Sequence, residues 1–173
     1  MTRSPGKHIT TCAVLTAAGL ILGYLETFIV MPFGIPGIRI GLANIVSLVA
    51  LYLAGPVSAC AVAFLRVSLS AILFGSPVSF AYSIAGAAAS VTGMYLLLKL
   101  GFSIWGVSVS GAILHNTAQI CVAFFLVGSR YVFVYLPALW LAGIITGLLV
   151  GFLSDKLIRR LKEYKYFEQE DFG

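Results

Sequence analysis

The sequence predicts an all-α integral membrane protein built as a bundle of six transmembrane helices. Hydrophobic residues make up 60% of its 173 residues, and charged residues make up only 10%. The mean hydropathy is +1.03, whereas a soluble domain of this size needs a much more polar surface. Because a membrane-crossing helix needs about 20 apolar residues, the chain has room for roughly six crossings with short connections.

Turn residues divide the apolar sequence into six runs. The predicted spans are residues 9–30, 40–54, 57–74, 78–98, 104–127 and 132–153. Glycine and proline mark most of the connections, as at Gly55 and Pro56 and again at Gly75 and Pro77. We therefore expect a six-helix transmembrane domain over residues 1–153. Residues 154–173 are expected to form a cytoplasmic tail that is first basic and then acidic.

The basic residues predict which way the bundle faces. Eight of the eleven lie before the first span, between the fourth and fifth, or after the sixth. With six spans these segments share one side of the membrane, so the positive-inside rule places both termini in the cytoplasm. The net charge of +5 is explained by this topology and by basic residues that contact anionic lipids of the bilayer. No nucleic-acid partner is expected.

Several polar residues lie inside or beside the apolar runs, where lipid contact is costly. A helical rise of about 1.5 Å per residue brings most of them to the outer half of the bundle. We expect a polar outer chamber there that binds a small molecule. Its candidate substrate-binding residues are Glu26, Arg39, Asn44, Arg66, Tyr82, His115, Asn116 and Gln119.

These residues also have structural interpretations, which the sequence leaves open. Glu26 and Arg66 could pair to hold helices together, and Arg39 could extend its charge to the membrane surface. His115, Asn116 and Gln119 could form hydrogen bonds between helices, and tyrosines near span ends often anchor the interface. The convergence of so many polar residues in one half favours a ligand site.

The predicted chain has six helices, both termini on the cytoplasmic side, and the small residues Ala13 and Ala17 one turn apart in the first helix. In these features it resembles the substrate-binding S-components of energy-coupling factor (ECF) transporters. Three stretches resemble one branch of these proteins, the Gx transporter family, often labelled heptaprenyl diphosphate synthase component I. They are residues 36–44, Arg66 with Phe74 and Gly75 further along the chain, and residues 108–116 with Gln119. The resemblance extends to about residue 153.

This resemblance implies a mechanism and a set of partners. In S-components the alanine motif docks on a transmembrane scaffold subunit that is linked to two cytoplasmic ATPases, and the S-component topples in the membrane. It implies that Ala13 and Ala17 are the docking residues and that the loop at 31–38 is a lid. The sequence has no Gly-x-x-x-x-Gly-Lys-Ser/Thr phosphate loop, so energy must come from a partner.

The expected function is therefore capture of a small, partly anionic nutrient or precursor from outside, for import. Arg39 and Arg66 are the residue type that best recognises a carboxylate or phosphate. We expect no enzyme activity, cofactor or metal, because Asp155 and Asp171 are the only aspartates and are too separated for prenyl diphosphate chemistry. The alternative is a non-catalytic membrane accessory subunit linked to isoprenoid or quinone biosynthesis or to electron transfer.

Overall fold

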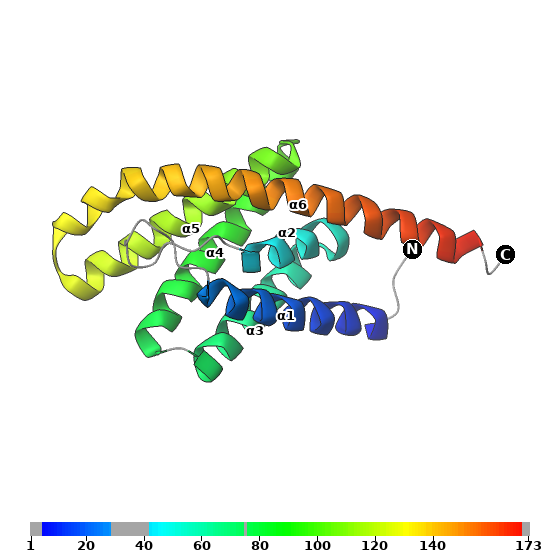
Figure 1. Ribbon diagram of the computed structural model, residues 1–173, viewed down its shortest axis with the longest axis horizontal. Coiled ribbons are helices and arrows are strands. Elements are labelled where there is room, and N and C mark those ends of the chain that lie inside the picture. Colours follow the sequence, from blue (N-terminus) through cyan, green and yellow to red (C-terminus); the bar gives the residue numbers. More distant parts are fainter. Residues whose placement is uncertain (1–4, 29–41, 75, 171–173) are drawn as a thin grey trace.

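The computed structural model describes residues 5–28, 42–74 and 76–170 of the chain (Figure 1). Within them the chain forms six α-helices, one 3-10 segment and no strand, so the predicted all-α fold is confirmed. The elements are α1 (Pro5–Thr27), α2 (Leu42–Ala54), α3 (Pro56–Phe74), α4 (Pro77–Lys99), α5 (Ile104–Val127), η1 (Arg130–Tyr135) and α6 (Leu136–Glu170).

Four helical segments of the described chain are long and apolar enough to cross a membrane by themselves. They are Pro56–Phe74, Pro77–Lys99, Ile104–Val127 and the stretch Arg130–Glu163. The apolar parts of α1 and α2, Ile9–Leu25 and Ala43–Ala54, are shorter. The 13 residues of α2 extend only about 20 Å, so this helix lies within the bundle without matching a full bilayer.

Local sequence explains where the helices begin and end. The hydroxyls of Ser76 and Ser103 accept hydrogen bonds from the backbone N–H groups three residues on, which caps α4 and α5. Gly128 ends α5 in the left-handed conformation, with φ at 68°. Gly55 has φ at 87° and precedes Pro56, which gives a connection of one residue between α2 and α3.

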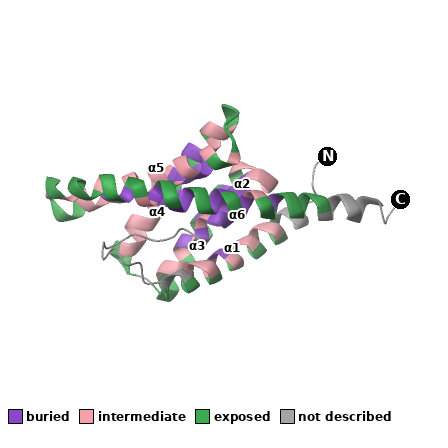
Figure 2. Ribbon diagram, turned by 45° about the horizontal axis from the view of Figure 1, so that its top comes forward, coloured by how far each residue is buried: buried purple, intermediate pink, exposed green. Residues whose placement is uncertain are grey.

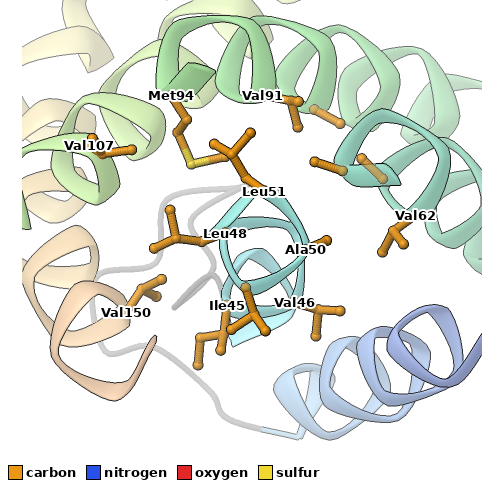
Figure 3. Close-up of a cluster of buried hydrophobic side chains, with 14 of the residues drawn as sticks. Ile45, Val46, Leu48, Ala50, Leu51, Val62, Val91, Met94, Val107 and Val150 are labelled. Carbon is orange, nitrogen blue, oxygen red and sulfur yellow. The ribbon is translucent and has the colours of Figure 1, made fainter. Parts of the chain in front are cut away.

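The short helix α2 lies at the centre of the core. Its Leu48 and Val49 are fully buried, and the neighbouring helices direct apolar side chains at it (Figure 3). Burial is concentrated at this crossing point, whereas the outer faces of the other helices remain exposed (Figure 2). Large apolar side chains such as Ile72 and Phe125 are each 80% exposed on those faces. Such a surface is suited to lipid contact.

Close packing of α5 on α6 depends on glycine. A Cβ atom added to Gly147 would lie only 2.7 Å from Cα of Val109, so the two backbones touch at this point. The Ser108 hydroxyl donates a 2.7 Å hydrogen bond to the Gly147 carbonyl across the same contact. Small residues and interhelical hydrogen bonds of this kind are how membrane helices associate.

The sixth helix differs from the predicted span of 132–153. Its apolar run begins as the 3-10 segment η1, and α6 then continues unbroken to Glu170. The 35 residues of α6 extend about 52 Å. The predicted boundary after Leu153 falls inside this helix, and Ser154 and Ile158 beyond it are buried in the bundle. The start of α1 and the end of α6 lie at the same end of the molecule (Figure 1).

Candidate functional site

A cavity of about 600 Å³ lies at the end of the bundle that holds the last turns of α1, α3 and α5 and the first turns of α2 and α4. Its volume is within the usual range for small-molecule sites. One part of its lining is polar and comprises Asn44, Arg66, Ser70, Ser76, Ser79, Tyr82, Ser83, His115, Gln119 and Tyr135. The apolar part comes mainly from α5, η1 and α6 and includes Ile120, Ala123, Val127, Val132 and Leu139.

Arg66 supplies a fixed positive charge to this cavity. It is half-buried on α3, and its side chain passes directly over Gly19 of α1. A Cβ atom at Gly19 would lie 2.8 Å from Cδ of Arg66, so a larger residue there would displace the arginine stem. Ser70 follows one turn later on the same face of α3. No aspartate or glutamate occurs among the described residues that line the cavity.

His115 is held against the backbone of α4. A Cβ atom added to Gly86 would meet three atoms of the imidazole ring at 2.7 to 2.9 Å, so the ring occupies the space that glycine leaves. Gln119 lies one turn further along α5. His115, Gln119 and Asn44 line the cavity and also a smaller space behind it. They therefore stand at the boundary between the two.

The smaller space, called the recess below, has a volume of about 50 Å³ and lies among α2, α4, α5 and α6. Asn116 lines it but does not line the large cavity. The Asn116 side-chain amide donates a 2.8 Å hydrogen bond to the carbonyl of Leu139 on α6. This hydrogen bond joins α5 to α6. Asn116 therefore has the role of linking helices, which the sequence left open as an alternative to ligand binding.

The structure thus brings five of the eight predicted site residues to one cavity: Asn44, Arg66, Tyr82, His115 and Gln119. Glu26 belongs to α1, but the surroundings of its side chain lie outside what the structure describes. Arg39 and the proposed lid at 31–38 lie outside the described residues altogether. That any of the eight binds substrate stays a prediction.

Sequence reasoning missed several hydroxyl groups of the cavity. Ser70, Ser76 and Ser79 line it, and so does Ser83. The available signal was spacing: Ser70 follows Arg66 by four residues, and Ser83 follows Ser79 by four, so each pair shares a helix face. In the described residues, no three His, Cys, Asp or Glu side chains lie close enough together to hold a metal ion.

The predicted docking residues lie on an exposed face of α1. Ala13 and Ala17 are both exposed and one turn apart, whereas the adjacent Thr16 is buried against the bundle. The face carrying the two alanines is therefore accessible to another helix. Its use as a docking strip stays a prediction.

The fold matches that of a solved bacterial protein, described as "Structure and mechanism of the S component of a bacterial ECF transporter". The TM-score is 0.74 at 20% sequence identity, and the match covers 93% of this chain and 98% of that one. The molecule is therefore a helical membrane bundle with the fold of an S component. The family model described as heptaprenyl diphosphate synthase component I matches residues 15–157, and the chain belongs to that family. No curated protein matches the sequence.

Proposed function

We propose that the chain is the substrate-binding subunit of an ECF-type importer, which captures a small, partly anionic nutrient or precursor outside the cell and delivers it inward. The observation that carries this proposal is a fold like that of an S component, with a cavity of about 600 Å³ at one end that contains Arg66. The family is named after a synthase, whereas the cavity suits reversible capture of a ligand.

The charges at the two ends of the bundle support the proposed orientation. Lys99 ends α4 at the end of the bundle opposite the cavity, and the basic segment of α6 that includes Arg160 extends beyond that end. With these residues and both termini in the cytoplasm, the cavity faces outward. An outward-facing cavity is the arrangement that an import subunit needs before it delivers its ligand.

The chemistry of the cavity favours an anion with an apolar portion. Arg66 offers a planar set of N–H donors, which matches the geometry of a carboxylate or phosphate. Serine hydroxyls and Tyr82 supply further hydrogen bonds on the α3 and α4 side. The opposite wall of Ile120, Val127 and Leu139 suits the apolar body of a ligand.

Transport requires partners under this proposal. The exposed strip of Ala13 and Ala17 docks on a transmembrane scaffold subunit, and two cytoplasmic ATPases supply the energy. The chain itself has a binding role and no catalytic one. Its contact with the lipid bilayer is through the exposed apolar faces of the helices.

The test is retention of ligand by the purified protein. The chain is purified from its native membrane, and bound small molecules are released and identified by mass spectrometry. We expect an anionic molecule in the wild type that is lost in Arg66→Gln, since truncating one member of a buried charge pair weakens binding by about 2 kcal/mol or more. Arg130→Gln is the matched control, because Arg130 is exposed and does not line the cavity. Equal ligand content in the wild type and Arg66→Gln would refute the role of Arg66.

The family description supports a second candidate, a non-catalytic membrane accessory subunit of isoprenoid or quinone biosynthesis or of electron transfer. It predicts a stable complex with a prenyl synthase or redox protein and no dependence on a scaffold or ATPases. A catalytic role is not proposed, since Asp155 is engaged with Arg159 at 3.0 Å and belongs to no acidic cluster among the described residues.

A further inference from the structure

The recess behind the cavity differs from it in chemical character. It is bounded by four helices and carries six neutral side chains with oxygen atoms: Asn44, Ser90, Ser108, Asn116, Gln119 and Thr146. No Lys, Arg, Asp or Glu occurs among its described lining residues. Ser90 and Ser108 are 3% and 4% exposed, so these groups are deep inside the bundle. A buried set of polar groups requires a partner to satisfy it.

Two of its hydroxyls are available only as acceptors. The single hydroxyl proton of Ser108 is donated to the Gly147 carbonyl at 2.7 Å, and that of Thr146 to the Gly143 carbonyl at 3.4 Å. A hydroxyl that has donated its proton retains only lone pairs for other partners. These two hydroxyls therefore suit a group that brings its own hydrogen-bond donors, and the amides of Asn44 and Gln119 can present their oxygen atoms to the same group.

The size of the recess limits what enters it. A volume of about 50 Å³ has room for about three waters, or for one terminal group of a larger molecule. It shares Asn44, His115 and Gln119 with the large cavity, so the two spaces adjoin at these three residues. The body of the ligand remains in the cavity beside Arg66.

We propose that the recess is the part of the substrate site that recognises a small hydrogen-bond donor group, an amine or a hydroxyl, at the end of the ligand opposite its anionic group. This inference rests on the proposed function and narrows it. The substrate class is then a small organic anion with a carboxylate or phosphate for Arg66 and an amino or hydroxyl end for the recess. An ammonium group fits well, because its three N–H donors need three acceptors.

The test uses probes that differ only in that end. Binding of 4-aminobutyrate, 4-hydroxybutyrate and pentanoate to the purified chain in lipid nanodiscs is measured by ligand-observed NMR titration, as is binding of the phosphate esters O-phosphoethanolamine and propyl phosphate. In the wild type we expect a donor-ended probe to bind about tenfold or more tightly than its methyl-ended counterpart. The comparison of amine with hydroxyl identifies which donor is preferred.

Two recess variants on different helices test the assignment. Thr146→Val keeps the shape of the side chain and removes its oxygen, and Ser90→Ala removes a hydroxyl on α4. Each is expected to bring the ratio between donor-ended and methyl-ended probes close to one. Ser110→Ala is the control, because the Ser110 hydroxyl bonds to the Gly106 carbonyl on the same helix and lines neither space. Thermal unfolding of each variant checks that the bundle is intact.

The outcomes separate this inference from the proposed function. Equal binding of donor-ended and methyl-ended probes in the wild type, with all probes weakened by Arg66→Gln, would overturn the donor subsite and leave anion capture standing. A wild-type preference for donor-ended probes that both recess variants retain would also overturn the subsite. Absence of binding by every probe, together with equal ligand content in the purified wild type and Arg66→Gln, would count against both proposals.

Discussion

Replacing Gly86 by alanine is expected to disable the site without destabilising the fold. The added Cβ would lie 2.7 to 2.9 Å from three atoms of the His115 ring, whereas ordinary contact begins near 3.4 Å. The ring must therefore move by about 0.7 Å. If it moves directly away from a bound ligand, a hydrogen bond of about 2.9 Å between the ring and that ligand lengthens to about 3.6 Å and is broken. Loss of one hydrogen bond to a bound ligand costs about 1 to 3 kcal/mol, or roughly 5-fold to 150-fold in Kd.

The assay compares ligand affinity and thermal unfolding in the same preparation. Because alanine forms helix better than glycine, and because the displaced group is a side chain, the unfolding temperature of Gly86→Ala should be unchanged or higher. Gly106→Ala is the matched control on α5, since its nearest contact is an ordinary 3.4 Å to a ring atom of Phe102. Wild-type affinity in Gly86→Ala would refute the inference that the position of His115 matters for binding.

Three further changes test the packing of the bundle. Gly147→Ala places a Cβ atom 2.7 Å from the Val109 backbone, which has no rotamer to adopt, so thermal unfolding should show a loss of about 1 to 3 kcal/mol, and an unchanged midpoint would contradict the close contact. Thr117→Val removes the acceptor of the Trp140 indole N–H, and denaturant titration should show a loss of about 1 kcal/mol, which Thr117→Ser should restore. Asp155→Asn breaks the ion pair with Arg159, whose side chain is 74% exposed, so the unfolding temperature should stay close to that of the wild type, and a clear drop would show a larger role.

The positions of five helices could be predicted because apolar runs and glycine or proline breaks carry the signal directly. Residues 104–127 were predicted without error, and the third and fourth helices to within one residue at each end. The sixth was harder. The η1 segment Arg130–Tyr135 consists of aromatic residues and valines after its arginine, so it does not stand out from the apolar run that follows. Pro137 in the first turn of α6 is compatible with a helix that begins just before it. Buried Ile158 lies in a basic sequence that resembles a tail.

The candidate site could be predicted only in part, for a physical reason. Arg66 and His115 are conspicuous because polar groups of their size are costly in a membrane. A serine in a helix can bond to its own backbone, so Ser79 or Ser90 carries no comparable signal. The recess depends on how closely Gly147 lets α6 approach α5, which no single stretch of sequence specifies.

The most direct test of the account is to identify what co-purifies with the tagged chain from its native membrane in mild detergent. An Ala13→Trp, Ala17→Trp double variant is purified in parallel, because both alanines are exposed and bulky residues there would block close approach of another helix without disturbing the core. If the chain is the substrate-binding subunit of an importer, the wild type should recover a transmembrane scaffold subunit and ATPases, and the double variant should lose them. Recovery of a prenyl synthase or redox protein instead, unaffected by the double variant, would contradict the transport function and favour an accessory subunit.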